Sequence, residues 1–277
     1  MSQHRDGPPR ILTAGYLTLD VIVRDLASLN YWDAVGGTCG NVSTIAVTLG
    51  AEVTILARIG QDKRGERLLA RLQAVGVGTS DIEEVAQKHT PGIVELVRAG
   101  KQKEHLFSFT CPGCDSHLPR AAVVSARRAK KAASHIQDFD AFFFDRATPA
   151  TLLLAEAARE AGLLVVYEPT RTPRTEASIK AAALSDIVKV ASHPGSSLED
   201  WRPTPGSSTG FLVETLGAQG VRFIWRAPEG WTEWTHLTAV HVDDFQDAAG
   251  AGDWLTAGLL MECLRSKCQL SPRVVQQ

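Results

Sequence analysis

The sequence lacks the features that mark membrane-spanning and secreted proteins. No apolar run in its 277 residues approaches the ~20 residues that a membrane-spanning helix needs. The opening segment, MSQHRDGPPR, has no apolar stretch of the kind found in signal peptides. The five cysteines are an odd number and too few for a disulfide framework in a chain of this length. We therefore expect a cytoplasmic protein with reduced cysteines and no membrane partner.

An excess of charge of either sign is also absent. The 29 Lys and Arg residues nearly balance the 31 Asp and Glu residues, and they are scattered along the chain. Nucleic-acid-binding proteins usually carry a basic stripe or patch. We therefore expect no nucleic-acid partner.

Several common catalytic and metal-binding motifs are missing as well. The chain contains no HExxH, no GxSxG, no P-loop and no GxGxxG after its first expected strand, which excludes the commonest zinc protease, hydrolase, P-loop and dinucleotide-binding readings. Cys111 and Cys114 have the spacing of half a zinc site or a redox pair, but no second pair of ligands follows. The sequence therefore leaves any metal site unknown.

What the chain does have is a long alternation of extended and helical patterns. The expected helices are Pro119–Ala133, Pro149–Ala161 and Thr175–Leu184, and the expected strands between and after them are Ala141–Asp145, Leu163–Glu168 and Ile187–Val190. This alternation predicts an α/β fold with a doubly wound, mostly parallel sheet and helices on both faces. The last strand is expected at about Ala239–Val242. A further helix is expected at Lys63–Val75, with Arg64, Arg67 and Arg71 on a solvated face.

Two stretches depart from this alternation. Residues 89–110 alternate apolar and polar side chains with a period of two, which predicts a hairpin outside the main sheet. We expect this hairpin and residues 20–35 to form a small β lid on a single domain that spans residues 1–277.

A stretch of small residues near the end of the chain runs into a helical pattern. Gly250, Ala251 and Gly252 would let successive backbone N–H groups at a helix start turn toward one anion, helped by the helix dipole. Asp253 follows in the first helical turn and could accept a proton from a hydroxyl that attacks a bound phosphate. The alternative is an ordinary helix start in which Asp253 satisfies free N–H groups.

Candidate acceptor-binding residues lie in the first part of the chain. Asp20 stands where the strand that begins at Ile11 is expected to end, and ligands collect at the carboxyl ends of parallel strands. Gly36 and Gly37 would let the backbone approach a ligand, and Asn41 offers both a donor and an acceptor. Such groups suit a polyol. The alternative is that Asp20 caps a turn and that the glycines form a common Gly-rich turn with Asn41 as a helix cap.

Two separated segments together resemble the PfkB (ribokinase-like) family of carbohydrate and nucleoside kinases. The first runs from Gly36 through Asn41 and its helix to the stretch Arg58–Gly65. The second, Asp247–Asp253, is similar to the family's D-T-T-G-A-G-D. The resemblance spans nearly the whole chain. It implies a ribokinase-like fold, an ATP-dependent phosphotransferase, and ATP and Mg²⁺ as cofactors, with a monovalent cation as a further candidate. It also implies a sugar or nucleoside substrate and a homodimer that forms through the lid.

The resemblance further implies roles for individual residues. Asp253 would be the base, and the backbone from Gly250 to Asp253 would form the anion hole. The acceptor would be bound by Asp20, Gly36, Gly37 and Asn41, and the nucleotide would lie near Thr215, Gly217, Gly220 and Asp247.

The chain also departs from the family pattern. The family's N-x-x-E motif is absent from Lys189–Gly195, Ala248 and Ala249 replace hydroxyl residues, and the segment after Asp253 is short. Two functions therefore stay open. One is a kinase that phosphorylates a hydroxyl of a sugar, nucleoside or related polyol, and the other is a non-catalytic or regulatory sugar- or nucleoside-binding protein derived from such a kinase.

Overall fold

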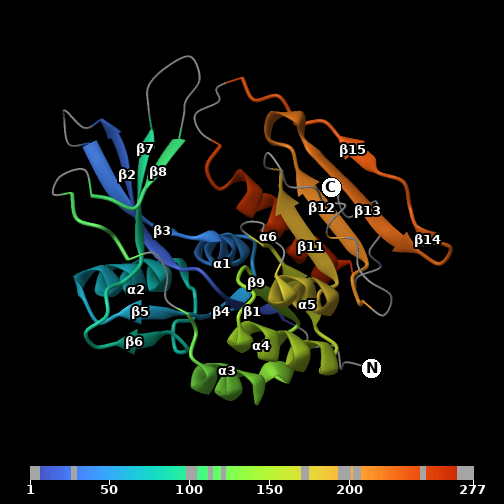
Figure 1. Ribbon diagram of the computed structural model, residues 1–277, viewed down its shortest axis with the longest axis horizontal. Helices are drawn as coiled ribbons and strands as arrows, with labels where there is room; N and C mark the ends of the chain where they lie inside the picture. The colour runs from blue at the N-terminus through green and yellow to red at the C-terminus, as the bar shows by residue number, and fades with distance from the viewer. Residues whose placement is uncertain are drawn as a thin grey trace.

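The protein is built around a large twisted sheet, as Figure 1 shows for the computed structural model. The structure describes residues 7–25, 30–97, 105–111, 115–119, 123–169, 175–192, 201, 207–243 and 248–266. The nine strands of the large sheet follow the order β14-β13-β12-β11-β10-β9-β1-β4, with β15 also paired to β13. The parallel strands are β1 (Arg10–Ala14), β4 (Glu52–Leu56), β9 (Ala141–Phe144), β10 (Leu164–Tyr167), β11 (Ile187–Ala191) and β12 (Phe211–Thr215), and the antiparallel ones are β13 (Val221–Ala227), β14 (Gly230–Trp231) and β15 (Thr235–Leu237).

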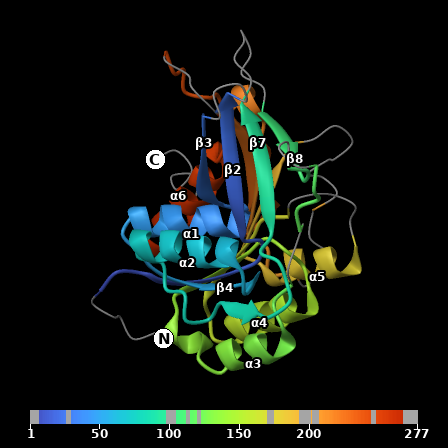
Figure 2. The ribbon, with the colours of Figure 1, turned by 90° about the vertical axis from the view of Figure 1, so that its left-hand side faces the viewer.

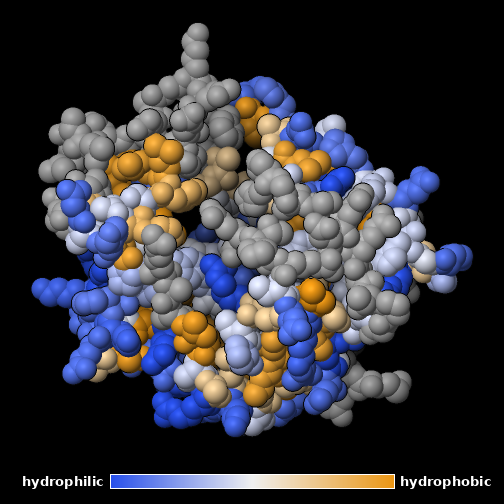
Figure 3. Space-filling model, in the orientation of Figure 1, coloured by the Kyte–Doolittle hydropathy of each residue, from blue (hydrophilic) through white to orange (hydrophobic). Residues whose placement is uncertain are grey.

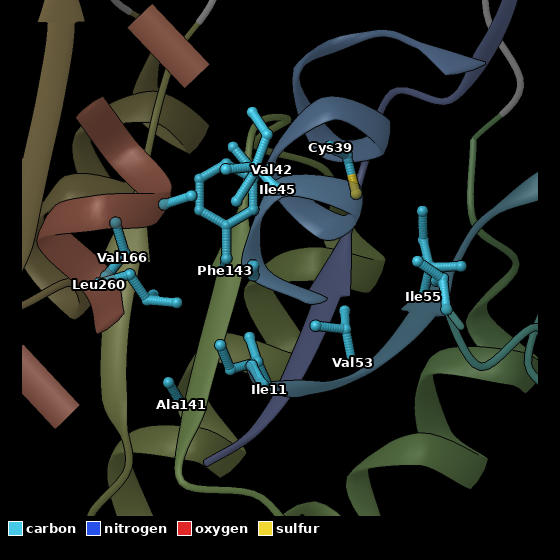
Figure 4. Close-up of a cluster of buried hydrophobic side chains, with 14 of the residues drawn as sticks. Ile11, Cys39, Val42, Ile45, Val53, Ile55, Ala141, Phe143, Val166 and Leu260 are labelled. Atoms are coloured by element: carbon cyan, nitrogen blue, oxygen red, sulfur yellow. The ribbon is translucent and has the colours of Figure 1, made fainter. Parts of the chain in front are cut away.

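Helices cover both faces of this sheet, so the predicted doubly wound α/β fold is confirmed (Figure 2). One face carries α1 (Thr38–Thr48), α2 (Lys63–Val75) and α6 (Ala251–Arg265), and the other carries α3 (Ala126–Ala133), α4 (Pro149–Glu160) and α5 (Glu176–Leu184). Strand residues alternate between the two cores, so that Phe143 packs in one and Phe142 in the other. Figure 4 shows the first core, where Phe143 lies among side chains of α1 and α6.

A second sheet of four strands stands apart from the large one (Figure 1). Its order is β3-β2-β7-β8, with bounds β2 (Thr18–Asp25), β3 (Asn30–Gly36), β7 (Gly92–Val97) and β8 (His105–Ser108). These strands occupy nearly the segments in which the sequence predicts a β lid, 20–35 and 89–110. Movement of this sheet as a lid, and its membership of one domain, stay predictions. A short pair, β5 (Arg58–Gly60) and β6 (Glu83–Val85), lies beneath α2.

Helix α2 supports the four-stranded sheet rather than presenting a wholly solvated row of arginines. The Arg64 guanidinium donates to the Leu19 carbonyl oxygen at 3.1 Å. Arg67 pairs with Asp33 at 3.3 Å, and Arg71 contacts the same carboxylate. The side chains of Arg67 and Arg71 are 68% and 47% exposed, so the expected solvated face is confirmed for these two residues. Only Arg64 departs from it, because its partly buried guanidinium packs against β2.

The expected position of Asp20 was also wrong. The first strand ends at Ala14, and Gly15 follows, where an added Cβ would lie 1.8 Å from Asp145 Oδ1. The chain then leaves the large sheet, and Asp20 lies inside β2, paired with Ala34 of β3. Asp20 therefore reaches the site from the second sheet rather than from the carboxyl end of β1.

The expected last strand, at 239–242, is not a strand. The edge of β13 is taken by β15, and Val240 and Val242 are 88% and 57% exposed. An extended apolar segment without a partner has no surface against which to bury its side chains. In the part of the chain that the structure describes, no helix is both long enough and apolar enough to span a bilayer.

Candidate active site

A cavity of about 240 Å³ lies between the four-stranded sheet and the first turns of α1 and α6. Its wall is formed by Asp20, Ile22, Ala34, Val35, Asn41, Thr44, Ile45, Glu95, Ala249, Gly250 and Trp254. The structure thus brings together Asp20, Asn41 and Gly250, three residues that the sequence placed in the site. Glu95 and Trp254 belong to the same wall and were not predicted.

Asp20 is held in place by its neighbours on the second sheet. The Thr18 hydroxyl donates to Asp20 Oδ1 at 2.6 Å. A Cβ on Gly36 would lie 1.8 Å from Asp20 Oδ2, so the glycine leaves the room that the carboxylate occupies. Burial, with a smaller contribution from the charge of Glu95, raises the pKa of Asp20 to about 6. Gly36 therefore acts through Asp20 and is not itself part of the cavity wall.

The turn into α1 places Asn41 beside Asp253. Gly37 is the N-cap of α1. Glycine is needed at this position because φ is +75° and because a Cβ would lie 2.4 Å from the Tyr16 carbonyl oxygen. Asn41, one turn later, donates from Nδ2 to Asp253 Oδ2 at 2.7 Å across 212 residues of sequence. Burial raises the pKa of Asp253 to about 6, and the charge of Glu168 adds to this shift.

The start of α6 differs in one detail from the expected anion hole. Gly250 adopts φ of +76°, and its carbonyl accepts the first helical hydrogen bond, from Trp254 N at 2.9 Å. The N–H of Ala251 donates to the Ala248 carbonyl at 3.1 Å, so it closes the preceding turn and is not aimed at the cavity. The predicted anion site at this helix N-terminus would therefore depend on Gly252 and Asp253, and it stays a prediction.

A buried ion pair lies directly beneath this helix start. Lys189, in the middle of β11, is 2% exposed and pairs with Glu168, which follows β10. The Thr256 hydroxyl donates to the second Glu168 oxygen at 2.6 Å. An added Cβ on Gly252 would lie 2.9 Å from Lys189 Nζ, so the ammonium group touches the first turn of α6. None of these three side chains was predicted to belong to the site.

A further buried carboxylate fixes the segment after β1 and the start of α1, the helix that carries Asn41. Asp145, directly after β9, accepts hydrogen bonds from Tyr16 N at 2.8 Å and from Cys39 N at 3.2 Å. Burial raises its pKa to about 7. The nearest Arg146 nitrogen lies 3.7 Å from its second oxygen. Asp145 thus ties β1 to the start of α1 and sets the position of that helix.

Of the predicted nucleotide-binding residues, Thr215, Gly217 and Gly220 lie at the carboxyl edge of the large sheet and do not line the cavity. Thr215 ends β12, and its carbonyl accepts from Ser192 N at 2.9 Å. Gly217, with φ of +59°, begins a short 3-10 turn after it. Glycine is needed at position 220 for packing, because a Cβ there would lie 2.0 Å from the Leu237 carbonyl oxygen. Asp247 lies outside the described residues. Nucleotide binding by these residues stays a prediction.

The described residues do not assemble a protein-only metal site. No group of three or more His, Cys, Asp or Glu side chains comes together among them. Cys111 is a partly buried thiol, and Cys114 lies outside the described residues. The two oxygens of Glu168 already accept from Lys189 and Thr256.

Comparison with known proteins gives matches to sugar and nucleoside kinases. Residues 12–268 match the family model described as pfkB family carbohydrate kinase. The chain is 26% identical over 235 residues to the bifunctional protein HldE of Pelobacter propionicus. That match covers 80% of this chain and 46% of the relative, so the chain spans about half of the relative's length.

Solved structures share the fold at low sequence identity. A fructokinase with bound ATP from Xylella fastidiosa has a TM-score of 0.72 and 20% identity, with 96% of this chain and 84% of that chain covered. An aminoimidazole riboside kinase from Salmonella enterica, complexed with aminoimidazole riboside and an ATP analog, has a TM-score of 0.68 and 23% identity, with 96% and 88% covered.

Proposed function

The chain belongs to the pfkB family of carbohydrate kinases, and we propose that it transfers the terminal phosphoryl group of ATP to a hydroxyl of a small sugar or related polyol. The observation that carries this proposal is the hydrogen bond from Asn41 to Asp253 beside the cavity and at the start of α6. It joins an acceptor pocket, a candidate base and a helix N-terminus in one place. The names of the similar structures, a fructokinase and an aminoimidazole riboside kinase, agree with an acceptor of this class.

Asp253 would act as the general base. The Asn41 amide holds Oδ2, which leaves Oδ1 to accept the proton of the attacking hydroxyl. A carboxylate with its pKa raised to about 6 is ionised at neutral pH and is a stronger base than an exposed aspartate. Asp20 and Glu95, across the cavity, would accept hydrogen bonds from other hydroxyls of the acceptor and orient it.

The phosphoryl group would meet the positive end of α6. The N–H groups of Gly252 and Asp253 lie in its first turn, where the helix dipole favours negative charge. The Lys189 ammonium lies against Gly252 in the same turn, and it would supply positive charge there that its partner Glu168 partly offsets. Together they would stabilise charge that develops during transfer.

We propose ATP as the phosphoryl donor, bound along the carboxyl edge of the large sheet near Thr215 and Gly217. Mg²⁺ would enter with ATP, because phosphates and water supply most of its ligands in such complexes, and it would neutralise phosphate charge. The absence of a three-ligand cluster among the described residues fits this mode better than a dedicated protein-only cage.

The kinase proposal is tested by ADP release with millimolar ATP and Mg²⁺ against a panel of neutral sugars, sugar alcohols and nucleosides. We expect ADP release that depends on the acceptor. Calorimetric titration with ATP distinguishes the kinase function from the alternative, a non-catalytic binding protein. Acceptor binding without ATP binding, and without ADP release for the whole panel, would favour a non-catalytic sugar-binding protein.

A homodimer through the four-stranded sheet also belongs to this proposal. Tyr31 on β3 and Phe107 on β8 are each 61% exposed, and Leu106 is 38% exposed. Figure 3 shows apolar surface gathered over this part of the molecule. Tyr31 and Phe107 lie on the two edge strands and point to opposite faces of the sheet, so each edge exposes one large side chain that a partner could cover. We expect a dimer by sedimentation equilibrium, and Tyr31→Lys together with Phe107→Lys should shift it to monomer. A wild-type monomer at micromolar concentration would contradict this.

A further inference from the structure

Trp254, in the first turn of α6, places a large aromatic ring on the wall of the acceptor cavity. Its side chain is 50% exposed, the highest value among the six tryptophans of the chain. Tryptophans are usually largely buried, because their rings offer a large apolar area for packing. Among the described residues, the ring of Trp254 stacks on no other aromatic ring. Packing within the protein therefore does not account for a tryptophan at this position.

The space beside this ring is open. Gly250, one turn earlier, lines the same cavity, and its carbonyl accepts the hydrogen bond from Trp254 N at 2.9 Å. Residues four apart at a helix start lie on the same side of the helix. A Cβ added to Gly250 would meet no heavy atom within 4 Å. A ligand in the cavity therefore has room to lie against the indole on the side of α6.

The cavity wall has an apolar part and a polar part. Trp254 shares the apolar part with Ile22 and Ile45, and the polar part includes Asp20 and Asn41. A sugar in its ring form has the same division, because its hydroxyls project from the rim while its C–H groups form an apolar patch on a face. An open-chain polyol carries the hydroxyls but has no flat face. The wall therefore matches a cyclic sugar better than an open-chain one.

We infer that Trp254 determines acceptor specificity by stacking on one face of the acceptor ring, and that the acceptor is a single-ring sugar. The inference rests on the proposed kinase function. The face of an indole carries the negative part of its quadrupole and attracts the slightly positive C–H groups of a sugar ring. Asp253 precedes Trp254 in the same turn, so a ring held on the indole would bring a hydroxyl toward the candidate base. The cavity of about 240 Å³ is smaller than the roughly 300–1,000 Å³ of sites for drug-sized ligands, which favours one ring over a nucleoside.

The inference is tested by the ratio of kcat/KM for each aldose that the protein phosphorylates to kcat/KM for the alditol made by reducing that aldose. The wild type should favour the aldose by about tenfold or more, the order of effect that stacking on an aromatic side chain gives. Trp254→Leu keeps an apolar side chain but removes the flat ring, and it should lower the ratio about tenfold, whereas Trp254→Phe should retain most of it. Trp231→Leu, the same change on β14 outside the cavity wall, is the control and should leave the ratio unchanged. A wild-type ratio below about threefold, or a ratio unaffected by Trp254→Leu, would overturn the inference.

A binding measurement separates this inference from the kinase proposal. Tryptophan fluorescence and the thermal unfolding midpoint are recorded without ATP, on addition of each aldose and of nucleosides. Bound aldoses should raise the midpoint of the wild type, Trp231→Phe and Trp254→Phe, and should change the fluorescence of the first two only. This result would support the inference even if no ADP were released. A fluorescence response that persists in Trp254→Phe, a larger rise of the midpoint with nucleosides, or the absence of either response with every aldose would overturn it.

Discussion

Asp253→Asn is expected to lower kcat by about 10²- to 10⁴-fold, the range that a positioned general base contributes. The amide keeps the size of the side chain and can still accept the hydrogen bond that Asn41 now donates to Oδ2 at 2.7 Å. Folding should therefore survive. The thermal midpoint should stay equal or rise, since burial disfavours the charged form of Asp253. Steady-state ADP release with a neutral sugar measures the effect.

The pH profile provides a second readout for the same residue. Burial and the charge of Glu168 raise the pKa of Asp253 to about 6, and only the ionised form can accept a proton. The wild-type kcat/KM should therefore fall as the pH drops below about 6. Asp20 has its pKa raised to a similar value, so its protonation would steepen the same limb.

The control for this prediction is Asp243→Asn, which makes the same change at a fully exposed side chain and should leave kcat unaltered. If Asp253→Asn retained kcat within about threefold of the wild type, the assignment of Asp253 as the base would be wrong.

Local patterns predicted most strands of the large sheet and most of its helices, although α3 begins at Ala126 rather than Pro119 and the strand expected at 239–242 is absent. Helix α2 has the predicted bounds because both of its ends are encoded nearby. Asp62 caps the first turn by accepting from Gly65 N at 2.9 Å, and Gly76 ends the helix in the left-handed conformation. The strand order of the second sheet was harder to predict, because a short strand pairs with strands that lie far away in the sequence. The break after β1 depends on Asp145, whose carboxylate takes the space beside Gly15.

The sequence predicted those site residues whose positions are determined by their neighbours in the chain. The turn that begins with Gly250 and the position of Asp253 in the first turn of α6 follow from local sequence. Glu95 could have been predicted as a site residue, because a single charged residue in an otherwise apolar strand is unusual and suggests a functional role. Glu168 stands at the carboxyl end of a parallel strand, and the rule applied to Asp20 would have selected it. Its pairing with Lys189 could not be read from the sequence, because it depends on the contact between two strands.

Lys189→Met should damage both folding and catalysis. Lys189 is 2% exposed and pairs with Glu168, so its removal leaves a buried carboxylate without its cation. Removing one partner of a buried pair typically costs about 3–5 kcal/mol of unfolding free energy. The positive charge of Lys189 also lowers the pKa of Asp253, while Glu168 raises it. The acid limb of the pH profile should therefore move to higher pH, and kcat should fall. Urea unfolding and the pH dependence of kcat/KM measure the two effects.

The double variant Lys189→Met with Glu168→Gln separates catalysis from folding. It removes both charges, so the unfolding free energy should return toward the wild-type value. The pH limb should move to lower pH than in the wild type, because Glu168 raises the pKa of Asp253 more than Lys189 lowers it. If Lys189 supplies charge to the transferred phosphoryl group, kcat stays low in the double variant. Full recovery of kcat would mean that Lys189 acts only as a counterion for Glu168.

Gly252→Ala tests the same contact from the side of α6, since its Cβ would lie 2.9 Å from Lys189 Nζ. Gly258→Ala, in the same helix with nothing within 4 Å of its added Cβ, is the matched control. Only Gly252→Ala should lower kcat, because it alone displaces the ammonium group from the first turn.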